Sequence, residues 1–184
     1  AYKGMERFFP ADKIVITGNP VRAEIYPAKT MDKAAAKAQL GFDPELPLCL
    51  VIGGSLGART INNSIQAGLE TLEQAQIQVL WQTGKNFTPD TSKVTKAKAE
   101  TFIFDMCTAY AAADIVVSRA GAISVSELCL LGKPCILVPS PNVSEDHQTK
   151  NAMALVNEGA AVLVKDIEAN LKLVNKVVEL AKDR

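Results

Sequence analysis

Residues 114–139 read DIVVSRAGAISVSELCLLGKPCILVP, and the rest of the chain can be interpreted outward from them. Residues 114–118 and 135–138 are short apolar runs, and residues 123–131 between them have helical spacing. Gly121 predicts a tight turn that a residue with a Cβ would resist. The stretch therefore predicts a strand, a loop, a helix and a second strand. In an open parallel sheet, the loop at the carboxyl end of such a strand is where ligands bind.

The expected helix carries one acidic residue, Glu127, in its first turns. Free amide N–H groups at a helix N-terminus suit an anion such as phosphate. A carboxylate beside a phosphate would repel it, so Glu127 needs another task. Accepting hydrogen bonds from the two hydroxyls of a ribose is the one we expect, and a solvated helix residue is the alternative.

Strand and helix patterns alternate along most of the chain with short connections. This alternation predicts an α/β fold, a Rossmann-like open parallel sheet of about six strands with helices on both faces. We place a boundary near Gly18: residues 1–17 look like the tail of a preceding unit, and residues 18–184 form the sheet domain. Further strands are expected at residues 14–17, 48–52, 77–82, 102–104 and 161–164, and further helices at residues 31–40, 61–72, 93–99, 106–113, 147–157 and 171–182.

Composition limits the possible functions. The chain has 184 residues, and its 20 basic residues balance its 20 acidic ones, which argues against a nucleic-acid binder. The longest apolar run is far shorter than the roughly 20 residues that span a bilayer. The four cysteines form no CxxC pair, so we interpret them as buried thiols in a reducing compartment. We expect a cytoplasmic protein that can lie on a membrane surface.

A glycine-rich loop, GGSLGAR at residues 53–59, follows the expected strand at residues 48–52. Gly53, Gly54 and Gly57 would let the backbone approach a phosphate, and Ser55 can donate a hydroxyl hydrogen bond. The loop matches neither the Walker A pattern nor the dinucleotide fingerprint, and a plain tight turn is the alternative. Residues 118–124 repeat the arrangement, which favours two phosphate-binding loops at one sheet edge.

Two polar segments complete the candidate site. Arg22 follows Gly-Asn-Pro-Val, whose proline stiffens the loop, so it could contact a nucleotide or form a surface salt bridge. In the second segment, Asp146 can cap a helix whose first turns carry His147, Gln148 and Asn151. The two amides suit sugar hydroxyls, whereas His147, the one histidine, is a weak general-base candidate. We find no metal-ligand cluster.

Four motifs in order resemble the MurG family, bacterial transferases that add GlcNAc to lipid I. They are TGNPVR at residues 17–22, GGSLGAR at 53–59, RAGAISVSE at 119–127 and DHQTKNA at 146–152. The resemblance covers essentially the whole chain, as the carboxyl-terminal half of such an enzyme. It implies one half of a GT-B glycosyltransferase, in which this half holds UDP-GlcNAc.

The resemblance also implies roles for individual residues. Leu56 and His147 each stand where members of the family often carry Gln, so their roles are open. The resemblance implies that Arg22 and Ser55 lie at the nucleotide and its phosphates, and that the backbone at Ile103 reads uracil. It places at the phosphates Ala122, Ile123 and Ser124, together with the loop glycines Gly53, Gly54, Gly57 and Gly121. It implies that Glu127 holds the ribose and that Gln148 and Asn151 lie near the GlcNAc.

The implied reaction is displacement with inversion at the anomeric carbon of UDP-GlcNAc by the C4 hydroxyl of the MurNAc unit of lipid I. Backbone N–H groups and helix ends, rather than a metal or another cofactor, would stabilise the departing UDP. In the family, the acceptor site, the general base and the membrane-docking patch belong to the amino-terminal half. We therefore assign no catalytic residue here and expect this chain to bind the donor without completing the transfer. In the full-length protein it would lie on the cytoplasmic side of the cell membrane.

Three other functions stay open. A separate donor-binding subunit of a two-component GlcNAc transferase would have the same fold and ligand. A UDP-GlcNAc 2-epimerase of GT-B fold would need catalytic carboxylates and a histidine in its own pattern, which we do not see. A nucleotide-binding regulatory module would bind without catalysis, and a preference for NAD would exclude the transferase.

Overall fold

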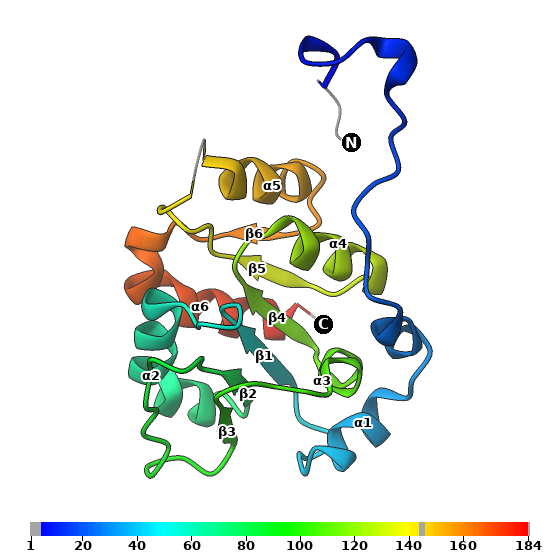
Figure 1. Cartoon of the computed structure of the whole chain (residues 1–184). Coiled ribbons are helices and arrows are strands. Elements are labelled where there is room, and N and C mark those ends of the chain that lie inside the picture. Colours follow the sequence, from blue (N-terminus) through cyan, green and yellow to red (C-terminus); the bar gives the residue numbers. More distant parts are fainter. Residues whose placement is uncertain (1–4, 144–145, 184) are drawn as a thin grey trace.

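A six-stranded parallel sheet forms the centre of the computed structural model, which describes residues 5–143 and 146–183 (Figure 1). The strand order is β3-β2-β1-β4-β5-β6, so the order reverses between β1 and β4, as in Rossmann-like sheets. The strands are β1 (Leu48–Ile52), β2 (Gln78–Gln82), β3 (Ala97–Glu100), β4 (Ile115–Ser118), β5 (Cys135–Leu137) and β6 (Val162–Leu163). The predicted fold class is confirmed.

Helices cover both faces of the sheet. They are α1 (Lys33–Gln39), α2 (Arg59–Gln74), α3 (Met106–Ala112), α4 (Ala122–Leu131), α5 (His147–Val156) and α6 (Ala169–Lys182), with short 3-10 helices η1 (Met5–Arg7), η2 (Ala11–Lys13), η3 (Ala23–Lys29) and η5 (Asp166–Glu168). Helices α2 and α6 pack on one face, and α1, α3, α4 and α5 with η3 cover the other. Within the described residues, we find no helix of the length and apolarity that crossing a bilayer requires.

Strand β1 shows why both faces need cover. All five of its residues are buried, with Leu48, Leu50 and Ile52 in one apolar cluster and Cys49 and Val51 in the other. Side chains alternate across a strand, so a continuous apolar run can be buried only between two layers of helices. The first cluster joins β1 to α3 and α4, and the second joins it to α2 and α6.

The predicted strand at residues 14–17 is wrong. Figure 1 shows the chain before η3 running away from the sheet as an extended segment, in blue. Val15 and Ile16 are exposed, and residues 14–17 pair with no strand among the described residues. An apolar run becomes a strand only where a neighbouring strand satisfies its backbone. Residues 1–4 of the predicted tail lie outside the described residues.

The edge of the sheet beyond β2 also differs from the prediction. The helix predicted at residues 93–99 and the strand predicted at residues 102–104 are both wrong, because the edge strand is β3. Ala97 and Ala99 of β3 pack against the second apolar cluster, whereas Lys98 and Glu100 are exposed. Pairing with β2 therefore overrides the weak strand preference of these residues.

The prediction that all four cysteines are buried is wrong for two of them. All are free thiols, and Cys49 and Cys135 are buried, but Cys107 is half-buried and Cys129 is exposed. Burial raises the pKa of the Cys135 thiol to about 11 and also raises that of Cys129. Cys129 is exposed because it lies on the outer side of α4, in the last turn before the C-cap residue Gly132.

A buried carboxylate closes the amino end of the sheet. Asp114, 5% exposed, lies just before β4, with Oδ1 2.8 Å from Nζ of Lys33 and Oδ2 2.7 Å from Nζ of Lys37. The backbone N–H of Leu48 donates to Oδ2 at 2.8 Å. Burial raises the pKa of this carboxyl, but its two lysine partners and the N–H outweigh burial, so the net shift is downward. The cluster therefore ties α1 to the start of β1 and β4.

Candidate functional site

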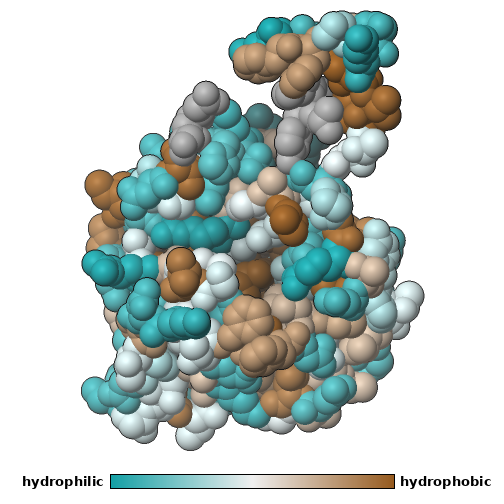
Figure 2. Space-filling model, in the orientation of Figure 1, coloured by the Kyte–Doolittle hydropathy of each residue, from teal (hydrophilic) through white to brown (hydrophobic). Residues whose placement is uncertain are grey.

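A cleft of about 830 Å³ opens at the carboxyl end of the sheet, where the strand order reverses. The last residues of β1 and β4, Ile52 and Ser118, are in register, so the loops that follow them stand side by side. In an open α/β sheet, this is the position of the ligand crevice. Figure 2 shows a hollow near the middle of this face, with hydrophilic residues on one side and hydrophobic residues on another.

The loop after β1 has little room for side chains. Gly57 has a φ of +76°, and a Cβ there would lie 2.0 Å from the carbonyl oxygen of Thr83. A Cβ at Gly53 would lie 2.5 Å from the backbone nitrogen of Ala58, and Gly54 has a φ of +86°. Glycine is needed at positions 54 and 57 because the loop is left-handed there, and Gly57 also lies against the residue that follows β2; at position 53 it is needed because the backbone of Ala58 is too close for a side chain. Helix α2 then begins with no side-chain cap on its first N–H groups, and its first residues, Arg59 and Thr60, line the cleft.

The loop after β4 is different, and our prediction for Gly121 is wrong. Its φ is −65°, which any residue adopts, and a Cβ there would meet only Ser124 Oγ, at 3.9 Å. Gly121 is the N-cap of α4, again without a side-chain cap. Two helix N-termini, those of α2 and α4, thus border one cleft with main-chain donors, and this arrangement suits a diphosphate.

Glu127 is buried at the wall of the cleft and is held by two partners. It is 2% exposed, and Arg22 Nε donates to Oε1 at 2.8 Å while Arg22 Nη2 donates to Oε2 at 3.2 Å. The hydroxyl of Tyr110 donates to Oε2 at 2.9 Å. The hydrogen bond to Glu127 raises the pKa of the Arg22 guanidinium, and burial together with the nearby carboxylate raises the pKa of Tyr110.

The arginine and the acid that the sequence suggested for one ligand therefore form a bidentate ion pair with each other. A carboxylate has about four acceptor positions, and three are used here. The position left is on Oε1. The pair is anchored nearby by Asn19, whose Nδ2 donates to the carbonyl oxygen of Ala122 at 3.2 Å and to Ser126 Oγ at 3.0 Å.

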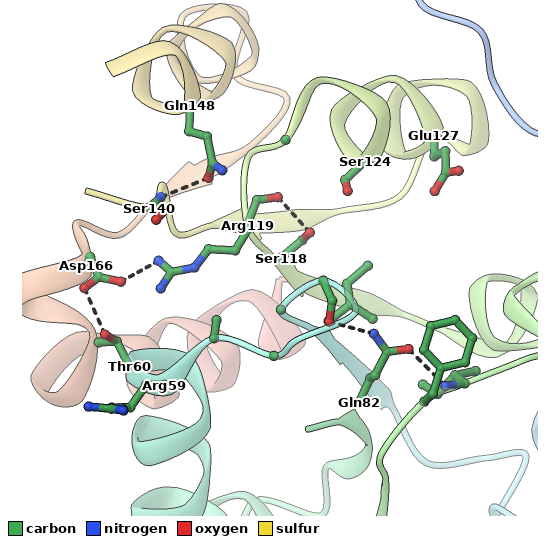
Figure 3. Close-up of a pocket in the computed structure, with 18 of the residues that line it drawn as sticks. Arg59, Thr60, Gln82, Ser118, Arg119, Ser124, Glu127, Ser140, Gln148 and Asp166 are labelled. Carbon is green, nitrogen blue, oxygen red and sulfur yellow. Dashed lines mark hydrogen bonds and ion pairs between the residues drawn. The ribbon is translucent and has the colours of Figure 1, made fainter. Parts of the chain in front are cut away.

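The side chain of Gln148, on α5, lies across the cleft from Glu127 (Figure 3). Gln148 lines the cleft and accepts from the backbone N–H of Ser140 at 2.9 Å, which presents its amide nitrogen as a donor. Asn151 donates to the carbonyl oxygen of Ala120 at 3.1 Å and so ties α5 to the loop after β4. His147 is exposed at the start of α5. Asp146 makes no side-chain cap bond to the backbone and accepts instead from the Thr149 hydroxyl, so the predicted cap is wrong.

Most of the predicted site residues come together in this cleft. Ser55, Ala122, Ile123 and Asn151 are not among the residues that line it, while the lining includes Arg22, Gly53, Gly54, Gly57, Ile103, Gly121, Ser124, Glu127 and Gln148. Ser55 and Ile123 are exposed, each next in the chain to a residue that lines the cleft. Among residues 5–143 and 146–183, no three His, Cys, Asp or Glu side chains gather as metal ligands would.

Several lining residues had not been singled out from the sequence. Asp166 joins two walls of the cleft, since Oδ2 accepts from the Thr60 hydroxyl at 2.9 Å and Oδ1 pairs with Arg119 Nη1 (Figure 3). Gln82 and Tyr110 also line the cleft. The sequence contains little indication of these residues. Arg119 is part of a motif, but its partner Asp166 lies 47 residues away along the chain.

An open parallel sheet with two glycine loops and two helix N-termini at the point where the strand order reverses defines the class of Rossmann-like ligand-binding domains. Residues 48–184 match the model of the glycosyltransferase family 28 C-terminal domain, and the chain belongs to that family.

Curated relatives support this family assignment. The chain is 55% identical over its whole length to the UDP-N-acetylglucosamine–N-acetylmuramyl-(pentapeptide) pyrophosphoryl-undecaprenol N-acetylglucosamine transferase of Parabacteroides distasonis, and 56% identical to that of Cytophaga hutchinsonii. It covers 51% and 50% of these proteins, and so spans about half their length. Among solved structures, that of Acinetobacter baumannii MurG matches with a TM-score of 0.65 at 26% identity, over 94% of this chain and 52% of that one.

Proposed function

We propose that this chain is the donor-binding, carboxyl-terminal half of an inverting transferase that moves GlcNAc from UDP-GlcNAc to lipid I, forming lipid II for peptidoglycan. The name shared by the curated relatives supports this reaction, and the family supports the half that the chain supplies. Residues 1–17 would then belong to the connection with the acceptor-binding half, and residues 18–184 to the donor domain.

The observation that carries the proposal is the cleft itself. Its main-chain donors come from the loops after β1 and β4 and from the first turns of α2 and α4. Such donors stabilise the negative charge that develops on UDP as the sugar leaves, because they are already oriented before the reaction. Ser55, Ala122, Ile123 and Ser124 lie on these segments, at or beside the cleft, and would contact the phosphates.

Glu127 would accept hydrogen bonds from the ribose. Only one acceptor position on its carboxylate is left by Arg22 and Tyr110, so holding both ribose hydroxyls requires one of these partners to give up a contact. We take this partner to be Arg22, which is 47% exposed, whereas Tyr110 is buried. The released guanidinium N–H would then serve a phosphate oxygen, which unites the two expected roles of Arg22 and Glu127. The backbone at Ile103 would read uracil, and Gln148 and Asn151 would lie near the GlcNAc.

The acceptor, lipid I, would be bound by the other half of the protein on the cytoplasmic face of the cell membrane. Transfer by this chain alone is therefore not expected, and its test is donor binding. Calorimetric titration with UDP-GlcNAc, UDP and NAD should show binding of the first two and none of comparable strength for NAD. A preference for NAD would contradict the proposal.

Replacing Glu127 by Ala should weaken UDP binding by about 1.5–3 kcal/mol, the range for hydrogen bonds to a charged group. The control is Glu70→Ala on α2. Glu70 does not line the cleft, and its Oε1 lies 3.7 Å from Nζ of Lys93 in an exposed ion pair. That control should bind UDP as the unaltered chain does. Equal affinities for both variants would remove Glu127 from the ribose site.

A further inference from the structure

Gln82, the last residue of β2, links two walls of the cleft. Its Nε2 donates to the carbonyl oxygen of Gly54 at 3.0 Å, and its Oε1 accepts from the backbone N–H of Ile103 at 2.9 Å (Figure 3). The side chain is 5% exposed, and both it and Ile103 line the cleft. One buried amide thus joins the first glycine loop to the loop between β3 and α3.

The two contacts require an amide at this position. Nε2 faces a carbonyl acceptor and Oε1 faces an N–H donor, so each end of the group meets its complement. A carboxylate would keep the contact with Ile103 but place an oxygen against the Gly54 carbonyl. An apolar side chain would leave both backbone groups without this partner, and unpaired buried backbone groups reduce stability.

The end of β2 is itself firmly held. The indole N–H of Trp81 donates to Oδ1 of Asn62 at 3.0 Å, and Asn62 Nδ2 donates to the carbonyl oxygen of Thr83 at 2.8 Å. The backbone N–H of Thr83 donates to the carbonyl oxygen of Glu100 at 2.8 Å. Gln82 therefore stands on a support that several hydrogen bonds fix, between the two loops that it links.

We propose that Gln82 is a positioning residue for the nucleotide, setting the distance and orientation between the backbone that faces the base and the loop that faces the diphosphate. This inference rests on the proposed function, since it takes Ile103 to the uracil and Gly54 to the phosphates. Uracil carries a donor at N3 where cytosine carries an acceptor, so a backbone edge held in one orientation separates the two bases.

The test uses a second glutamine on the same strand as its control. Gln78 begins β2, is 3% exposed and also ties the strand to a loop: Oε1 accepts from the Asp43 N–H at 2.7 Å, and Nε2 donates to the Asp43 carbonyl oxygen at 2.8 Å. It lies at the amino end of the sheet, away from the cleft. Gln82→Met and Gln78→Met both remove a buried amide while keeping side-chain volume.

We expect both variants to lower the melting temperature by similar amounts. Gln82→Met should weaken UDP binding at least tenfold and reduce the preference for UDP over CDP, whereas Gln78→Met should leave both within twofold of the unaltered chain. Gln82→Met with unchanged UDP affinity and unchanged UDP preference would overturn the inference. An equal loss for UDP and CDP would also overturn it, since that describes damage to the cleft without positioning of the base.

Gln82→Glu tests the contacts with Ile103 and Gly54 separately, and it tests the inference by itself if Gln82→Met does not fold. It keeps the acceptor for Ile103, so the preference for UDP over CDP should persist. It sets an oxygen against Gly54, so the gain in affinity from UMP to UDP should shrink at least fivefold; no change in that gain would contradict the linkage. An unaltered chain that binds none of these nucleotides would instead refute the proposed function.

Discussion

The two ends of the sheet are built from similar residue types and yet differ in what they can do. At the amino end, the carboxylate of Asp114 is surrounded by two lysines and a backbone N–H, and Gln78 fastens a loop. At the carboxyl end, the carboxylate of Glu127 meets an arginine that is 47% exposed, and Gln82 fastens two loops around a cleft. The first end is closed and the second is open.

The difference teaches where to look for function in such a domain. A buried acid is by itself a weak indication of a site, because structural ion pairs also bury acids. What separates Glu127 from Asp114 is the neighbouring space: Glu127 lines the cleft, whereas both lysine partners of Asp114 come from α1, which covers it. Changes at the amino end should therefore affect folding alone, and changes at the carboxyl end should affect binding.

The largest effect is expected from Asp114→Asn. It leaves the buried ammonium of Lys37 without its charged partner, and breaking a buried ion pair in this way typically destabilises a protein by about 3–5 kcal/mol. Denaturant unfolding should show that loss, while UDP affinity should stay within twofold. Asp32→Asn is the control, because Asp32 is an exposed cap of α1 and Asn caps equally well. A large loss of UDP affinity in Asp114→Asn would break the distinction between the two ends.

A smaller effect, about 2–3 kcal/mol, is expected from Gly57→Ala, because the added Cβ meets the carbonyl of Thr83 and φ is positive. Gly121→Ala should change the free energy of unfolding by less than about 0.5 kcal/mol, since its φ is ordinary and its surroundings are open. Thermal unfolding of the two variants side by side makes the measurement. Equal destabilisation would show that the two loops are alike in their need for glycine.

An effect smaller than that of Gly57→Ala is expected from the pH dependence of stability at the amino end. The pKa of Asp114 is lowered on folding, so its stabilisation is fully present above its unfolded pKa, about 4, and is lost as pH falls below that value. Between pH 5 and pH 3, the stability difference between the unaltered chain and Asp114→Asn should narrow by about 1 kcal/mol. Urea unfolding at both pH values measures it, and a difference that widens would have the wrong sign.

Strong periodicity and strand–loop–helix order made most of the fold predictable. The apolar run that became β1 and the regular spacing of Ile61, Ile65, Leu69 and Leu72 on α2 leave few other ways to bury those side chains. The errors lie where tertiary pairing decides. Residues 14–17 have strand-like composition but no partner strand in the part of the chain that the structure describes, whereas Ala97–Glu100 has few residues that favour strands and pairs with β2. In Ala97–Glu100, the alternation of alanine with charged residues was the one feature that indicated a half-buried strand.

The candidate site was predictable in its motifs and not in its internal bonds. Glycine patterns and polar residues after strands located both loops, Arg22 and Glu127. That Arg22 binds Glu127 directly, 105 residues away, depends on how the segment before η3 passes over α4. The sequence predicts Gln82 only as the end of a strand, because nothing in one sequence shows which backbone groups a buried amide will meet.

The indole of Trp81 gives the protein an intrinsic fluorescent probe next to the cleft. Trp81 is the one tryptophan in the chain, is fully buried, and stands next to Gln82 with the ring of Phe87 5.3 Å away. Its emission therefore reports the packing at the end of β2 without any added label. Occupancy of the neighbouring cleft, or loosening of the loops around it, should be visible as a change in that single fluorophore.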